Sequence, residues 1–266
     1  MRRLGTGMLV TAAALALATP ASAQYYSTPP ECAPTQNTIV GTEKNDLRGG
    51  TPLNDLMLGF GGDELYEGES GDDCLVLGTG NDRGNGGEGN DTLFGEDGID
   101  RLGGNDGDDK VFGNAGGDIM SGGDDNDHLA GDAGDDRITA GNGRDRATGG
   151  TGDDMLSMGG AVDRANGGRG EDAIFGGPQN DRLDGAAGDD KVRGNSGNDV
   201  IRGGTGADRL NGGEGGDRIV GGPGDDRIAA RDGERDRVSC GRGDDSVVAD
   251  RGDRVAPDCE SVKRRR

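Results

Sequence analysis

An acidic residue recurs every nine positions through most of this chain, beside glycine-rich segments. The period runs from Gly41 to Ala229 as twenty-one consecutive units without insertion or deletion, and the sixth place of every unit is acidic. It is Asp in all units but one, where Glu64 replaces it. Carboxylates at fixed spacing, next to turns that expose backbone carbonyls, are the oxygen ligands of a hard divalent cation. The spacing therefore predicts a series of cation sites.

Calcium is the cation that this ligand set favours, and we expect several ions per chain. Ca²⁺ tolerates irregular oxygen coordination, whereas Mg²⁺ demands octahedral geometry and retains its water. Zinc is disfavoured because the only histidine is His128, which we interpret as a surface residue, and the thiols are not clustered. The predicted ligands are Asp73, Asp82, Asp91, Asp100, Asp109, Asp118, Asp127, Asp136, Asp145, Asp154, Asp163, Asp172, Asp181, Asp190, Asp199, Asp208, Asp217 and Asp226.

Some of these Asp residues could instead stabilise turns by bonding their own backbone. That alternative is strongest near the ends of the array and in units that depart from the pattern. Residues 41–67 match loosely, and residues 158–163 lack glycine at the first and fourth places. Gly84 stands where most units have an apolar residue, and it should leave a gap in the core.

Each unit combines a turn with a short strand. In residues 86–94 the first six positions are turn formers, and we expect glycine at the first and fourth places to allow positive φ. Leu93, at the eighth place, should point inward, while Thr92 and Phe94 should point outward. The eighth place is apolar in nineteen of the units, with Arg48 and Gly84 as exceptions. Two units make one coil, so the sequence predicts an all-β parallel solenoid of roughly ten coils around an apolar ladder.

Stacking of these coils brings the sixth-place carboxylates into rows. Two unit charges about 5 Å apart repel by about 3 kcal/mol at an effective dielectric of about 20. The chain has a net charge of −22 and 3% aromatic residues, a composition that is otherwise typical of disorder. We therefore expect folding to depend on a cation. The same charge argues against a nucleic-acid partner.

Basic residues occupy the seventh place in eleven units. We interpret them as surface charge that offsets the neighbouring acids. The alternative is an external charge ladder for a polyanion, which the net charge disfavours.

The N-terminus has the features of a cleaved signal peptide at residues 1–23. Arg2 and Arg3 precede an apolar run, Met8–Thr19, which is too short for a membrane span and is followed by Ala21-Ser22-Ala23. The sequence therefore predicts a secreted, extracellular protein.

The four cysteines fit two disulfides in an oxidising compartment. Three pairings are possible, and we favour Cys32–Cys74 with Cys240–Cys259, because each bond then clips one terminal segment locally. The expected organisation is a lead-in at 24–40, the repeat array at 41–229, decayed repeats and a cap at 230–262, and a basic tail at 263–266.

Well-formed units such as residues 149–157 (GGTGDDMLS) and 203–211 (GGTGADRLN) resemble the hemolysin-type, or RTX, calcium-binding nonapeptide repeat. The resemblance covers the whole array, and the chain looks similar to small secreted actinobacterial repeat proteins. It implies a right-handed parallel β-roll with Ca²⁺ between turns of neighbouring coils. It also implies that Asp91 and Asp109 share one ion, and that Asp100 and Asp118 share another on the opposite edge.

These features indicate a non-enzymatic, monomeric calcium-binding protein that folds when it binds Ca²⁺. The chain has no HExxH motif, and His128 alone cannot build a zinc protease or a histidine-dependent triad. A calcium-stiffened surface or matrix protein, or an adhesin in contact with cell-wall material, is the alternative. An enzyme that uses carboxylates on the solenoid wall is a third possibility, although no residue breaks the period in a way that marks a site.

Overall fold

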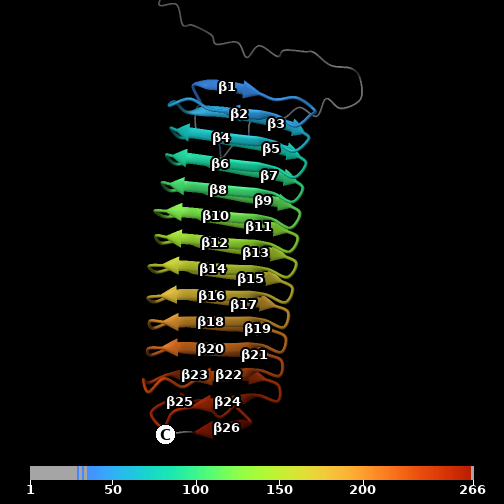
Figure 1. Ribbon diagram of the computed structural model, residues 1–266. Helices are drawn as coiled ribbons and strands as arrows, with labels where there is room; N and C mark the ends of the chain where they lie inside the picture. The colour runs from blue at the N-terminus through green and yellow to red at the C-terminus, as the bar shows by residue number, and fades with distance from the viewer. Residues whose placement is uncertain (1–28, 30–31, 33–34, 265–266) are drawn as a thin grey trace, which may run out of the picture. The chain divides into compact units, whose positions relative to one another are not determined.

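The computed structural model of this protein describes residues 29, 32 and 35–264, and the expected signal peptide lies outside them. The regular structure of these residues consists of β-strands in two parallel sheets, which face each other along the coils (Figure 1). The chain alternates between the sheets, so odd-numbered strands form sheet A and even-numbered strands form sheet B.

Sheet A contains β1 (Asn37–Val40), β3 (Asp55–Gly61), β5 (Cys74–Thr79), β7 (Thr92–Asp97), β9 (Lys110–Ala115), β11 (His128–Ala133), β13 (Arg146–Thr151), β15 (Arg164–Arg169), β17 (Arg182–Ala187), β19 (Val200–Thr205), β21 (Arg218–Pro223), β23 (Arg237–Arg242) and β25 (Arg254–Val255).

Sheet B contains β2 (Leu47–Gly49), β4 (Leu65–Ser70), β6 (Arg83–Glu88), β8 (Arg101–Asp106), β10 (Ile119–Asp124), β12 (Arg137–Asn142), β14 (Met155–Gly160), β16 (Ala173–Pro178), β18 (Lys191–Ser196), β20 (Arg209–Glu214), β22 (Arg227–Ala230), β24 (Ser246–Ala249) and β26 (Ser261–Arg264).

The predicted all-β parallel solenoid is confirmed, with more coils than expected. Each sheet has 13 strands rather than about ten, because β1 precedes the periodic array and the coils continue after Ala229. Neighbouring strands pair two units apart, as in Leu93 with Val111. One extra residue after Ala230 changes this offset, and Arg218 therefore pairs with Arg237. Lys263 and Arg264, expected in a basic tail, belong to β26.

The core is the ladder of eighth-place side chains between the sheets. Leu93, Val111 and Leu129 are fully buried in it. The expected gap at Gly84 is filled, since a Cβ atom there would lie 3.0 Å from Cδ1 of Leu77. Leu77 occupies the first place of its unit, where most units have glycine, and its side chain packs into the core.

A second apolar cluster lies apart from the main core. Phe94 belongs to it, as do Leu56, Cys74 and Val76, and its ring stacks on that of Phe112 with the centroids 4.9 Å apart. Cys32 packs against this cluster and is bonded to Cys74. Phe94 therefore points away from the core, as predicted, but is covered.

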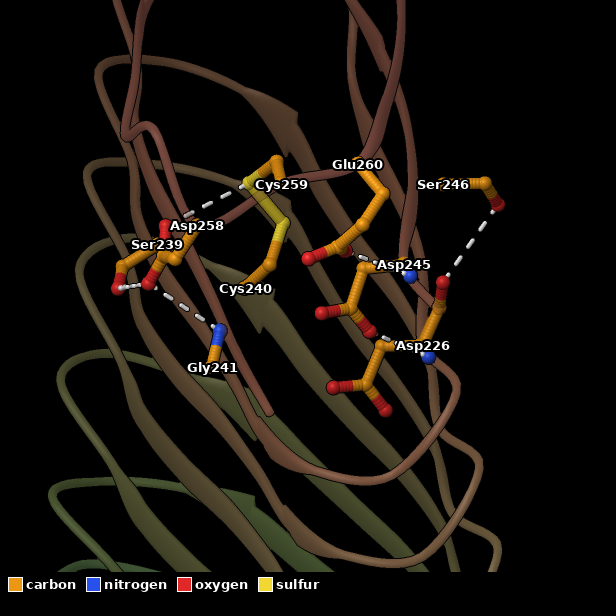
Figure 2. The surroundings of a disulfide bond; sticks show 9 residues. All are labelled: Asp226, Ser239, Cys240, Gly241, Asp245, Ser246, Asp258, Cys259 and Glu260. Carbon is orange, nitrogen blue, oxygen red and sulfur yellow. Dashed lines mark hydrogen bonds between the residues drawn. A yellow bond between two sulfur atoms is a disulfide. The ribbon is translucent and has the colours of Figure 1, made fainter. Parts of the chain in front are cut away.

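Both predicted disulfides are confirmed, and the second belongs to the C-terminal cap (Figure 2). Cys240 and Cys259 have their Cα atoms 5.2 Å apart. Next to them, the backbone N–H of Asp245 donates to a carboxylate oxygen of Glu260 at 3.0 Å. Glu260 thus accepts a hydrogen bond that would otherwise go to the next coil.

Candidate metal centre

The structure brings the predicted ligands together in two rows of buried carboxylates. Each acidic residue lies immediately before a strand, so alternate units contribute to opposite edges of the coil stack. Row A leads into sheet A and contains Asp73, Asp91, Asp109, Asp127, Asp145, Asp163, Asp181, Asp199, Asp217 and Asp236. Row B leads into sheet B and contains Glu64, Asp82, Asp100, Asp118, Asp136, Asp154, Asp172, Asp190, Asp208, Asp226 and Asp245.

One oxygen of each Asp carboxylate in the rows links two coils. The Oδ1 atom of Asp136 accepts the backbone N–H of Asp118 at 2.8 Å, and Oδ1 of Asp118 accepts that of Asp100 at 2.8 Å. In row A, Asp109 accepts the N–H of Asp91 at 2.7 Å in the same way. The pairs Asp91–Asp109 and Asp100–Asp118 are therefore neighbours, on opposite edges.

The second oxygen of each of these carboxylates has no protein partner. Oδ2 of every Asp in the two rows, from Asp73 to Asp245, is buried and accepts no hydrogen bond from the described residues. Asp100 and Asp136 illustrate the burial, at 0% and 2% exposed. A buried charged oxygen without a donor is strongly destabilising unless a cation or a proton compensates it.

First-place glycines line the space beside these oxygens. A Cβ atom on Gly131 would lie 2.0 Å from Oδ2 of Asp136 and 2.7 Å from the carbonyl oxygen of Gly149 in the next coil. Two oxygens from neighbouring coils thus approach the same point, which only glycine leaves free. The expectation of positive φ is confirmed for glycine at the fourth place and is wrong for the first place. Positive φ occurs at the second and fourth places, as in Gly150 and Gly152, whereas Gly149 does not adopt it.

The buried carboxylates have raised pKa values. Burial raises the pKa of Asp100, Asp109 and Asp136 to about 7. The hydrogen bond from the backbone N–H of the preceding coil opposes this rise in pKa, and repulsion from neighbouring carboxylates adds to it. Burial likewise raises the pKa of Asp127 to about 8. A proton or a cation therefore competes for each of these groups near neutral pH.

The N-terminal units differ from the rest. Both carboxylate oxygens of Asp55 have donors, from Asn37 and Thr51. Asp46 accepts from Thr42 and pairs with Arg48 at 2.9 Å. In these two units the carboxylates have protein partners, and neither residue was among the predicted ligands.

Three members of the rows were not among the predicted ligands. Glu64 replaces Asp, and both of its carboxylate oxygens are buried without a partner. Asp236 and Asp245 follow the extra residue near Arg231, which displaces them from the nine-residue period. The sequence feature that could have identified Asp236 and Asp245 is their position two residues before Val238 and Val247. This position preserves the spacing between the acid and the core residue.

Side chains alone do not form a metal site. Among the described residues, no group of three or more His, Cys, Asp or Glu side chains could hold an ion. The rows place one carboxylate per coil, so an ion between coils needs backbone carbonyls such as that of Gly149 as well. Calcium accepts such mixed oxygen ligands, which makes it the ion that fits.

Comparison with known families identifies the repeats. The family described as the RTX calcium-binding nonapeptide repeat (4 copies) matches residues 58–93, 85–120, 94–129, 121–156, 159–192 and 193–228. These matches cover more than half of the chain. The protein belongs to the RTX calcium-binding repeat family. A search of curated proteins gave no significant match.

RTX repeats bind Ca²⁺, and the rows of buried Asp residues in this member fit calcium-binding turns. The described part of this RTX protein contains no helix with the length and hydrophobicity of a membrane span.

Proposed function

We propose that this RTX protein is a secreted, non-enzymatic calcium-binding protein that folds when several Ca²⁺ ions bind along rows A and B. The observation that carries the proposal is the continuous series of buried Oδ2 atoms without donors, from Asp73 to Asp245. Divalent ions replace their mutual repulsion with attraction and supply the missing partners. Secretion is supported by the two disulfides, which are typical of oxidising compartments.

The eighteen predicted Asp residues are the proposed ligands, together with Glu64, Asp236 and Asp245. In each row, an ion between two coils would be held by carboxylates two units apart and by carbonyl oxygens of the glycine-rich turns. Asp118 and Asp136, with the carbonyl of Gly149 nearby, illustrate the donor set.

Three units should bind calcium more weakly than the others. The first place of most units is glycine, which leaves space beside Oδ2. In these three units the first place instead has a side chain, which is buried in the core. The side chains are Leu77, Ala140 and Met158, and the carboxylates of their units are Asp82, Asp145 and Asp163.

Far-UV circular dichroism during a calcium titration tests the proposal. The mature chain should be largely unfolded in EDTA at neutral pH and should gain β-structure at about 0.1–1 mM Ca²⁺, the range of extracellular modules. Calorimetry should then show several ions per chain. The same β-spectrum in EDTA and in millimolar calcium would exclude calcium-dependent folding.

A further inference from the structure

Sheet A carries a positive outer face in a chain whose net charge is −22. We call the outer surface of the eight strands β9 to β23 of this sheet the cationic face (Figure 1). These strands contain nine basic residues and two acidic ones, Asp132 and Asp184. The basic residues are Lys110, Arg146, Arg164, Arg169, Arg182, Arg202, Arg218, Arg237 and Arg242.

Most of these basic residues stand in one straight row. Arg164 pairs in register with Arg146 on one side and Arg182 on the other. The row continues through successive strands, and it contains Lys110, His128, Arg146, Arg164, Arg182, Val200, Arg218 and Arg237. At about 4.8 Å between strands, its length is roughly 34 Å. Each basic side chain in the row is exposed.

The row is not neutralised by the protein. Among the described residues, the ion pairs are Arg48 with Asp46 and Arg202 with Asp184, so no member of the row has an acidic partner. The sixth-place acids are buried, and none of them forms an ion pair with a member of the row. Like charges directly opposite each other in a sheet are destabilising. An external anion would relieve this repulsion.

The exposed acids at the fifth place of the turns lie mainly on one edge. In the turns that lead into sheet B, the fifth place is acidic at Asp135, Asp153, Glu171, Asp189 and Asp225. In the turns that lead into β9 to β21 of sheet A, the equivalent residues are Asp108, Asn126, Arg144, Val162, Asn180, Asn198 and Gly216, so one of these seven is acidic. Because alternate units lie on opposite edges, most of the acidic neighbours of the cationic face lie along one side, and Asp108, Asp125 and Glu234 lie along the other.

We propose that the cationic face binds an extended anionic polysaccharide, which lies along the row and across the strands. A straight series of cations less than 1 nm apart matches a linear polymer with regularly spaced carboxylate or sulfate groups. The exposed guanidinium groups can each form bidentate hydrogen bonds to such groups.

Other polyanions fit this face less well. Phosphates of duplex nucleic acid wind around the helix axis, so a straight row would contact only a few of them. Single strands bind on aromatic platforms, and Phe112 is the one aromatic residue apart from His128 in these eight strands. A flat anionic membrane would also meet the acidic edge that contains Asp153 and Glu171, whereas a single polymer chain would not.

Calcium should control this binding, a part of the inference that rests on the proposed function. The overall negative charge of the metal-free chain repels a polyanion. One Ca²⁺ for every two carboxylates of rows A and B would bring the chain close to neutrality and leave the cationic face unchanged. Folding also aligns the arginines, which the unfolded chain scatters.

The test compares two variants with equal change in net charge. The first is the triple variant Arg146→Gln, Arg164→Gln and Arg182→Gln on sheet A. The second is Arg137→Gln, Lys191→Gln and Arg209→Gln on sheet B. Binding of the mature protein to chondroitin sulfate, with unmodified dextran as the neutral polymer, is measured by calorimetry in 1 mM calcium and in EDTA. Circular dichroism and a calcium titration of each variant monitor folding independently.

We expect the wild type to bind chondroitin sulfate in calcium, and not in EDTA. The sheet A variant should bind about tenfold or more weakly, with its logarithmic salt dependence reduced by roughly two, while the sheet B variant should stay within about twofold of the wild type. Failure of the calcium-loaded wild type to bind, equal losses in both variants, or tighter binding to duplex DNA would overturn the inference. If calcium titration shows no binding but the sheet A variant still loses affinity, the proposed function fails and the polysaccharide site stands.

Discussion

Replacement of one carboxylate in the middle of row B by its amide should have opposite effects with and without calcium. Oδ1 of Asp136 accepts the N–H of Asp118, and Oδ2 has no partner among the described residues. Asparagine retains the Oδ1 acceptor and the shape of the side chain but removes the charge. Asp136→Asn therefore perturbs the electrostatics of the site with little change in packing.

Without calcium at pH 8, the substitution should stabilise the fold. Burial raises the pKa of Asp136 from 3.8 to about 7, so the ionised carboxylate disfavours the folded state at this pH. A shift of about three units corresponds to about 4 kcal/mol. We expect about 1–2 kcal/mol of this, because water near the turns raises the effective dielectric.

With calcium, the same substitution should destabilise the fold. Asp136 lies between Asp118 and Asp154 in row B, so loss of its charge weakens the sites on both sides. A site at ten times its dissociation constant contributes about 1.4 kcal/mol, and loss of two such sites removes about 3 kcal/mol.

Circular dichroism can measure both effects. In EDTA at pH 8, folding is induced with trimethylamine N-oxide, and Asp136→Asn should fold at a lower osmolyte concentration than the wild type. In a calcium titration, it should need more calcium. Asp106→Asn, at an exposed position at the end of β8, is the matched control and should change neither midpoint. A higher osmolyte midpoint, or an unchanged calcium midpoint, would refute the role assigned to the rows.

Three further predictions concern pH, the first-place glycines and the C-terminal cap. The carboxylates of the rows have higher pKa values in the folded state than in the unfolded state. Their protonation therefore stabilises the metal-free fold fully below about pH 4, and this stabilisation is lost as pH rises through about 6 to 8. In EDTA, circular dichroism should show more β-structure at pH 5 than at pH 8, and millimolar calcium should reverse that order. Gly131→Ala should lower the calcium stoichiometry measured by calorimetry, because its Cβ would lie 2.0 Å from a carboxylate oxygen, whereas Gly103→Ala, whose Cβ would be 3.7 Å from its nearest neighbour, should not. Replacement of both Cys240 and Cys259 by serine should destabilise the C-terminal coils by about 3 kcal/mol, seen as faster amide exchange there than in the central coils; uniform exchange would contradict a local role for the cap.

The sequence by itself determined the repeating architecture. A nine-residue period with an apolar residue two places after each acid repeats the same turn and strand along the chain. Such a chain can stack as coils, with each coil advancing by one strand spacing. The sequence also favoured the observed cysteine pairing over two alternatives, since each pair lies near one end of the array. These features depend on local spacing, which sequence retains.

The tertiary structure decided what depends on neighbours two units away. It showed that Leu77 fills the space at Gly84, and that Asp55 is satisfied by local donors while Asp73 is not. It also showed why the first place is glycine at Gly131. A side chain there would fill the space beside a carboxylate of the same unit and a carbonyl of the next coil, and the backbone conformation does not require glycine.

The row of basic residues along sheet A also required the coil. In the linear sequence, the units with a basic residue at the seventh place follow no evident order. Only when alternate units are assigned to opposite sheets do Arg146, Arg164 and Arg182 become adjacent, while Asp135 and Asp153 gather on the other edge. The physical reason is that side-chain contacts in a solenoid follow the coil of two units, whereas the sequence displays the single unit.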